Sequence, residues 1–244
     1  LTLRSHGDSG RVQLLAGLAE ARACRDISVL IGYCAIAGLE GREGRFAEAF
    51  AELAEAERLM HIWDVPPIYY LAMITLAKCE LWLRQGRTDL AEAWLLRLTQ
   101  TYNSELPASS PECDPQLPHH VELHCAALER IQGRAGDCAK RLATLENHAQ
   151  KIDGQLLLMA TLIQRIRLVL GTADEGQGSA MLQRCLLAAN GGALSPFNEL
   201  IEHHPDWLRR QLLQAEPCAA RDLLLAKLPA AACVALLETC ETTH

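Results

Sequence analysis

Apolar and polar residues alternate along this chain with the spacing of amphipathic helices. Leu and Ala fill most of the apolar positions, and both residues favour helix. Short polar breaks separate the apolar runs, and three of these breaks carry the pair Gly-Arg, at 44–45, 86–87 and 133–134. Each pair lies between an apolar run and an alanine-rich one. The pattern predicts an all-α protein made of helix pairs joined by glycine turns.

The glycine turns recur at a spacing typical of helical repeats. Gly44, Gly86 and Gly133 are 42 and 47 residues apart, and a further apolar run ends 38 residues later at Gly171. Repeats of this length are helix pairs that stack, because one pair cannot bury its apolar face alone. We therefore expect a solenoid, a superhelix of antiparallel helix pairs, over residues 1–192.

The first pair matches the tetratricopeptide pattern along its whole length. That pattern places large, small and apolar residues at fixed positions around the turn. Here these positions hold Tyr33, Ile36, Ala37, Glu40, Gly44, Phe46, Ala49, Leu53 and Ala56. Ala37 and Ala49 are expected where the two helices cross most closely, so a larger side chain at either position should overpack the crossing.

The later pairs keep the helical spacing but fit the pattern progressively less closely. They are expected at 68–102, 119–152 and 155–189. The last of them carries a longer turn at 172–177. Ahead of the first pair, Gly10-Arg11 and the apolar run 12–23 predict the second helix of a pair whose first helix is missing. We therefore expect that the chain was cut from a longer protein.

Two segments interrupt this order. Residues 103–118 hold four prolines, which cannot continue a helix, so a long surface loop is expected there, either an insertion or a lid. After residues 190–192 (Asn-Gly-Gly) the predicted helices are shorter, and each has proline near its start, where the ring is tolerated. Residues 193–244 are therefore expected to form a C-terminal helical cap that continues the solenoid.

Charge and hydropathy exclude two kinds of partner. The net charge is −7 and no run of basic residues exists, so direct nucleic-acid binding by this segment is not expected. The apolar run 156–163 is followed at once by Gln164 and Arg165, and no stretch reaches the roughly 20 apolar residues of a membrane span. No contact with a membrane is expected.

The ten cysteines indicate a reducing compartment. They form no Cys-x-x-Cys pair and lie mostly within apolar helical runs, as buried free thiols do. Cys113, in the proline-rich segment, is the expected exposed exception. The N-terminus has no signal-peptide apolar core. A cytoplasmic location is therefore expected.

Two motifs give the chain a resemblance to a known family. Residues 86–95 read Gly-Arg-x-x-x-Ala-Glu-x-Trp-Leu, and residues 191–200 read Gly-Gly-Ala-Leu-Ser-Pro-Phe-Asn-Glu-Leu. With repeats of about 40 residues, they make residues 10–214 resemble the tetratricopeptide sensor region of MalT-like, LuxR-type ATP-dependent transcriptional regulators. Asn198 stands where that family usually has an apolar residue.

The resemblance implies the effector-sensing domain of a bacterial regulator. In that family the solenoid binds an inducer and relieves inhibition of an upstream ATPase, so that the protein self-associates and binds a promoter. No cofactor is expected in this chain, since it has no Gly-x-x-x-x-Gly-Lys-Ser/Thr loop, and ATP would belong to a missing upstream domain. The alternative is a tetratricopeptide scaffold, a co-chaperone-like adaptor that holds a peptide or protein partner in its groove.

Polar side chains on the first helix of each pair are expected to line the concave face. Such a mixed-charge groove would suit a polar metabolite or a peptide carboxylate, because arginine forks match carboxylates. The candidate residues are Arg42, Glu80, Arg84, His120, Arg130 and Arg165. Trp63, Trp82 and Trp94 would either stack on a ring of the ligand or belong to the core.

Neither catalysis nor a metal site is expected. His119, His120 and His124, with Cys113 and Cys125 nearby, approach the spacing of metal ligands, but the carboxylate partner and a second cysteine pair are absent. Surface histidines explain this segment better. The sequence also lacks the Gly-x-Ser-x-Gly turn that presents a nucleophile, so the chain is not expected to be an enzyme.

Overall fold

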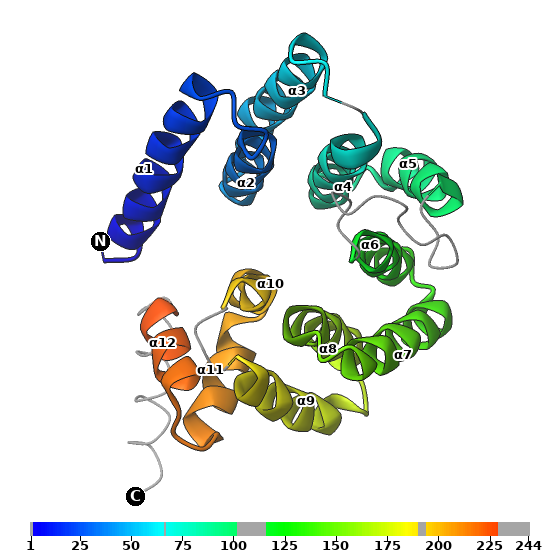
Figure 1. The fold of residues 1–244 in the computed structure, drawn as a ribbon. Helices are drawn as coiled ribbons and strands as arrows, with labels where there is room; N and C mark the ends of the chain where they lie inside the picture. Colours follow the sequence, from blue (N-terminus) through cyan, green and yellow to red (C-terminus); the bar gives the residue numbers. More distant parts are fainter. Residues whose placement is uncertain (1, 66, 102–115, 190–193, 229–244) are drawn as a thin grey trace, which may run out of the picture. The chain divides into compact units, whose positions relative to one another are not determined.

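The chain was studied as a computed structural model, which describes residues 2–65, 67–101, 116–189 and 194–228. These residues form helices and no strand, which confirms the predicted all-α class. In order, the elements are α1 (Thr2–Ala23), α2 (Val29–Arg42), α3 (Phe46–Ile62), α4 (Pro67–Arg84), α5 (Thr88–Thr101), α6 (Leu117–Ile131), α7 (Ala135–Lys151), α8 (Gln155–Val169), α9 (Glu175–Ala188), η1 (Ser195–Phe197), α10 (Asn198–His203), α11 (Pro205–Gln214) and α12 (Ala219–Lys227) (Figure 1). Within the described ranges, every helix is too short or too polar to cross a membrane.

The chain divides into two compact units, residues 1–138 and 139–244. The division falls inside α7. The boundary that the sequence predicted after residue 192 lies inside the second unit, where α10, α11 and α12 share one apolar core with α8 and α9. The expected fourth pair and the helices expected to cap it therefore share one apolar core.

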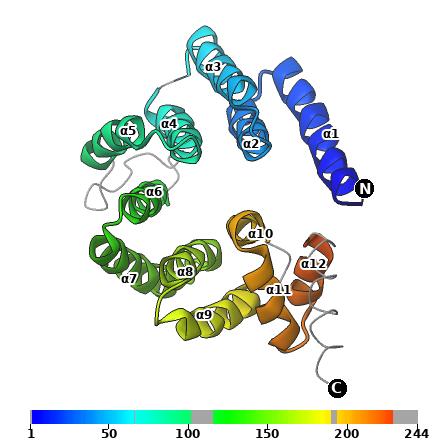
Figure 2. The same ribbon diagram turned by 180° about the vertical axis from the view of Figure 1, so that it is seen from behind.

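In the first unit, each helix packs against its neighbours along the chain. α2 packs against α3 and α4 against α5, while α2, α4 and α6 also pack one against the next. α3 and α5 lie on the other side of this row (Figures 1 and 2). Gly41 allows the close approach of α2 to α4, because a Cβ at this position would collide with the buried side chain of Leu81.

The small residues of the first pair lie where the sequence predicted them. Ala37 and Ala49 are both fully buried in one apolar core, which joins α2, α3 and α4 and also contains Leu53 and Ala56. A second core joins α4, α5 and α6, and Cys79 fills its small position on α4. Small residues at these positions let neighbouring helices approach closely.

The glycine turns share one backbone geometry. Gly44, Gly86, Gly133 and Gly171 have φ values of 76°, 72°, 74° and 76°, a left-handed region that glycine enters without strain. After each of the first three glycines, the next amide donates to the carbonyl five residues earlier. These bonds are Arg45 N to Glu40 O (2.9 Å), Arg87 N to Trp82 O (2.8 Å) and Arg134 N to Glu129 O (2.8 Å). This is the Schellman closure of a helix, and it confirms the predicted turns within the pairs.

A second kind of turn alternates with the first and was missed by the sequence analysis. Between successive pairs, Arg25, Asp64 and Asp153 adopt φ values of 53°, 53° and 52°. The same closing bond follows each of them, as in the 2.9 Å bond from Val65 N to Met60 O. Aspartate tolerates this conformation better than most residues do. Asp64 and Asp153 are therefore a sequence signal for two of these turns, and Arg25 gives none.

Three predicted boundaries are wrong. The helix expected to begin after Gly10-Arg11 begins at Thr2, as α1, so these two residues lie within a helix. The long turn expected at 172–177 is short, because Thr172 accepts a hydrogen bond from Asp174 N (3.2 Å) and α9 then begins at Glu175. The loop expected to run to Pro118 ends earlier, because α6 begins at Leu117 and the proline sits in its first turn, where it is tolerated. The rest of that loop, 103–115, and the helix expected at 229–241 lie outside the described residues.

Enlarging Ala49 to Leu should destabilise the first unit. Its side chain is fully buried at the crossing of α2 and α3, so Ala49→Leu is expected to lower the free energy of unfolding by about 1–3 kcal/mol. Ala51→Leu on the exposed face of the same helix is the control and should change it by about 0.5 kcal/mol or less. Urea unfolding followed by helical circular dichroism measures both; equal effects would show that the crossing is loosely packed.

Candidate functional site

Two of the predicted groove residues form a direct pair on α4. Glu80 and Arg84 are one helical turn apart, and Arg84 Nε donates to Glu80 Oε1 at 3.2 Å. The side chain of Arg84 is only 16% exposed, whereas that of Glu80 is 39% exposed. Arg42, at the end of the neighbouring α2, is exposed. The structure thus places an arginine–carboxylate pair in the row formed by α2, α4 and α6.

The two candidates on α6 lie far apart on their helix. His120 is in its first turn and Arg130 in its last, about 15 Å apart along the axis at 1.5 Å per residue. Both are half-buried. The backbone carbonyl of His120 lies 2.8 Å from His124 Nδ1. One small ligand therefore does not contact both ends of α6.

Arg165 belongs to the second unit and faces a buried carboxylate there. Glu146 of α7, whose side chain is 9% exposed, pairs with Arg165 of α8 and with Arg184 of α9, the latter at 2.7 Å. Gln150 Nε2 also donates to Glu146 Oε1, at 3.3 Å. We call these four residues the Glu146 cluster. Arg165 is thus engaged by a carboxylate of its own unit.

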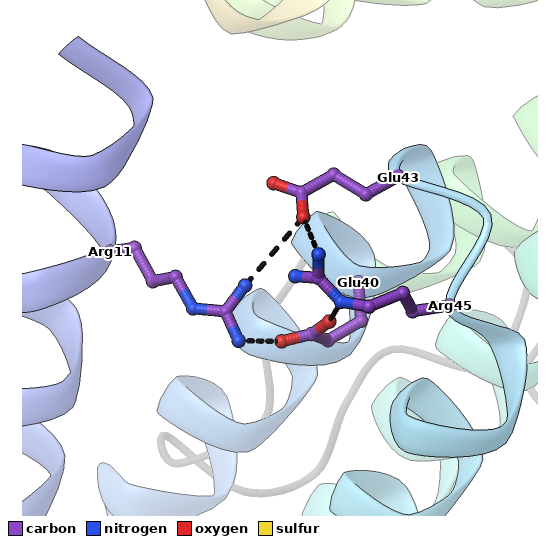
Figure 3. A network of polar contacts seen from close by, with 4 residues as sticks. All are labelled: Arg11, Glu40, Glu43 and Arg45. Carbon is purple, nitrogen blue, oxygen red and sulfur yellow. Dashed lines mark hydrogen bonds and ion pairs between the residues drawn. The ribbon is translucent and has the colours of Figure 1, made fainter. Parts of the chain in front are cut away.

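The first unit also contains a buried carboxylate, Glu40, in the last turn of α2. Its side chain is 3% exposed and pairs with Arg45, which follows the glycine turn, and with Arg11, which comes from α1. Glu43 is half exposed and pairs with the same two arginines, with Arg11 Nη1 at 3.6 Å (Figure 3). Two arginines and two carboxylates therefore connect α1, α2 and the turn after α2.

The sequence holds a further signal for this network. Glu40 lies four residues before Gly44 and five before Arg45, and the same Glu-x-x-x-Gly-Arg spacing recurs at 129–134. Glu129 is also buried, at 4% exposure. In the second pair, Trp82 takes this position and stacks at a tilt on Phe50, with 6.0 Å between ring centroids. The position four residues before the glycine is therefore buried in the first and third pairs and partly buried in the second.

Arginine contacts change the acidity of the carboxylates in this region. The hydrogen bond from Arg45 holds the pKa of Glu40 below its usual value, and the nearby Arg11 acts in the same direction. On α3, the hydrogen bond from Arg58 similarly lowers the pKa of Glu55. Glu52 differs, because burial raises its pKa and the negative charges of Glu40 and Glu55 raise it further.

A second contact from α1 reaches the same side of α2 and α3. Arg22 Nη1 donates to the hydroxyl of Tyr33 at 2.9 Å, and Arg22 Nη2 pairs with Glu55 at 2.9 Å. The carboxylates that α1 meets or approaches define one surface, which we call the α2–α3 acidic face. It consists of Glu40, Glu43, Glu52 and Glu55. This surface offers ionic binding of guanidinium groups.

The tryptophans divide between core and surface. Trp63 and Trp82 are partly buried against the two cores of the first unit. Trp94 on α5 is 38% exposed, and the guanidinium of Arg97 lies 5.0 Å from its ring centroid. Of the three, Trp94 alone is exposed, and Arg97 lies over its ring.

The described cysteines are partly buried thiols and partly exposed ones, and none of them is placed in a metal site. Cys79, Cys138 and Cys185 are buried free thiols, as predicted, whereas Cys24 is exposed in the turn after α1. Cys113, the exception expected from the sequence, lies outside the described residues. Within the described ranges, no three His, Cys, Asp or Glu residues are placed to hold a metal ion together.

Comparison with known proteins adds no relative. The chain matches no protein-family model, no curated protein and no solved structure. A function for it rests on its own residues and their arrangement.

The buried carboxylate Glu40 should make stability depend on pH. Because its pKa is lowered in the folded protein, its contribution is complete above the unfolded value of about 4.3 and is lost as the pH falls through the folded value. The wild-type protein should therefore be more stable than Glu40→Gln at pH 7, and this difference should shrink below about pH 4. Urea midpoints from pH 7 to pH 3 measure it. Glu20→Gln, at an exposed position of α1, is the control; a Glu40→Gln difference that does not shrink in acid would contradict the assignment.

The buried thiols should resist alkylation. Burial raises the pKa of Cys79 and Cys185 to about 12, which leaves about one thiolate in ten thousand at pH 8. Iodoacetamide at pH 8 followed by peptide mass mapping should label Cys24 and leave Cys79 and Cys185 unmodified until urea is added. Labelling of Cys185 as fast as Cys24 in the native protein would show that this core opens readily.

Proposed function

We propose that the chain is the effector-sensing region of a bacterial MalT-like, LuxR-type transcriptional regulator. In this proposal a tetratricopeptide-like solenoid binds a small-molecule inducer or a partner protein in its groove. ATP binding and promoter binding belong to other parts of the protein, which acts in the cytoplasm. Self-association of the whole protein would follow from inducer binding, as in the family that the sequence resembles.

The observation that carries the proposal is the strict alternation of two turn geometries. A glycine turn closes the first helix of each pair at Gly44, Gly86, Gly133 and Gly171, and a non-glycine left-handed residue precedes three of the pairs. Turns of the same geometry at equivalent positions are typical of a helical repeat array. They support a repeat array better than an irregular helical bundle.

The packing of the first unit supports a groove. α2, α4 and α6 are the first helices of three successive pairs and pack one against the next, and first helices line the concave face of a tetratricopeptide array. Arg84 lies in the middle helix of this row and is held beside Glu80. A half-buried guanidinium of this kind binds a carboxylate with more geometric specificity than an exposed one.

The C-terminal motif supports the sensor over the scaffold. Phe197, the aromatic residue of the Ser-Pro-Phe segment, is fully buried in the core shared by α8, α9 and the shorter helices. This is the place that a closing segment of a sensor solenoid would take. A C-terminal cap is expected in either kind of solenoid, so the preference for the sensor rests on the resemblance of residues 191–200 to the closing segment of that family.

Ligand-dependent melting tests the proposal. A ligand at one hundred times its Kd adds about 2.7 kcal/mol, which raises the Tm of a protein of this size by several degrees, at about 2–4 °C per kcal/mol. We expect a member of a panel of sugars, amino acids and aromatic acids to raise the Tm of the wild-type chain. Arg84→Ala should reduce the shift by at least half, while Arg87→Ala, at an exposed position of the next turn, should not.

Two results would count against this proposal. Stabilisation by short peptides alone would favour the scaffold, because a peptide fills a groove without an inducer. A small-molecule shift that Arg84→Ala leaves unchanged would place the ligand elsewhere than beside α4.

A further inference from the structure

Two arginines and Leu18 attach the N-terminal helix α1 to the rest of the first unit, and Leu18 lies so close to Gly32 of α2 that a Cβ there would collide with it. Arg11 pairs with Glu40 and Glu43, and Arg22 pairs with Glu55 and with the hydroxyl of Tyr33. Arg11 reaches across from α1 to the end of α2 (Figure 3). The two arginines are eleven residues apart, about three turns of helix, so they hold α1 at two separate points.

Apolar packing contributes little to this attachment. Among residues 11–23, whose side chains the structure describes, none is buried. Leu18 and Ala21 are partly buried against the first core, whereas Val12 is 65% exposed and Leu15 is 43% exposed. By contrast, α2 and α3 contribute Leu30, Ala37, Ala49 and Leu53 to that core, all fully buried. Over residues 11–23, α1 therefore contributes less buried apolar surface than the helices it covers.

The surface beneath α1 keeps its own counterions when α1 leaves. Glu40 retains Arg45 and Glu55 retains Arg58, so each of these carboxylates still has a partner on its own side. Burial raises the pKa of Glu52 on the same face, and the negative charges of Glu40 and Glu55 raise it further. The α2–α3 acidic face can thus stand uncovered without leaving a buried charge unpaired.

We propose that α1 is a releasable strap that is held over the α2–α3 acidic face by an ionic latch, Arg11 and Arg22. The strap opens while α2 and α3 stay folded, because α1 is held chiefly by ion pairs from two partly exposed arginines, which salt weakens. The contacts between α2 and α3 are apolar. Once released, α1 loses its helix, since an isolated helix of this length is marginal in water. Opening uncovers four carboxylates and the hydroxyl of Tyr33. This inference does not depend on the sensor function.

Hydrogen exchange on the full chain tests the strap. At low salt, amides of residues 11–23 should be protected from exchange. Raising NaCl from 50 to 500 mM should speed their exchange about tenfold, because salt weakens the ion pairs of Arg11 and Arg22. Amides of α2 and α3 should change by less than about twofold over the same range. This comparison uses the unmodified chain, so it does not depend on whether a variant folds.

Variants separate the latch from general charge effects. Arg11→Gln with Arg22→Gln should speed exchange of α1 at 50 mM NaCl to the rate of the wild type at high salt, and should remove most of the salt dependence. Arg58→Gln is the matched control, because Arg58 is an exposed arginine that pairs with Glu55 from within α3. This substitution should leave α1 protected.

Either of two results would overturn the proposal. The first is exchange of α1 that does not respond to salt in the wild type or to the double substitution. The second is exchange of α1, α2 and α3 at one common rate under all conditions, since the three helices would then open together as one cooperative unit.

Discussion

Each helix pair in this chain depends on a backbone conformation that glycine alone enters without strain. At Gly44, Gly86, Gly133 and Gly171 the chain turns through positive φ, and after the first three the next amide closes the preceding helix by bonding five residues back. The turn brings the second helix against the first, so that small residues such as Ala37 and Ala49 meet in the core. A side chain at these glycines would be strained even though space is open around them.

The same turns decide where charge is buried. The residue four positions before the glycine points into the packed region, and in the first pair it is Glu40. A buried carboxylate is stable only with partners, and Arg45, immediately after the glycine, supplies one of them. The recurring Gly-Arg pair therefore has two roles in the first pair: glycine shapes the turn, and arginine neutralises the carboxylate that the turn buries. In the third pair, Arg134 bonds instead to Gln132 on its own turn.

Local features of the fold were predictable from the sequence, and long-range polar contacts were not. The glycine turns, the small residues at the first crossing and the start of α11 at Pro205 follow from spacing and from residue chemistry, and the structure has them. The start of α9 was misplaced because Thr172 closes a tight turn with its hydroxyl. The arginine pairs of α1 escaped prediction since Arg11 and Glu40 are 29 residues apart, and helical periodicity does not say which charged faces meet. The ion pair of Arg165 with Glu146 was likewise not predicted, because the two residues lie on different helices and are 19 residues apart.

The order of packing in the first unit bears on how that unit folds. α2 contacts α3 and α4, and α4 contacts α5 and α6, so most partners are neighbours or next neighbours along the chain. Loops that close between such partners are short, and domains rich in local contacts fold rapidly. A nascent chain leaving the ribosome would therefore complete each pair soon after its second helix emerges, before the remaining helices have been synthesised.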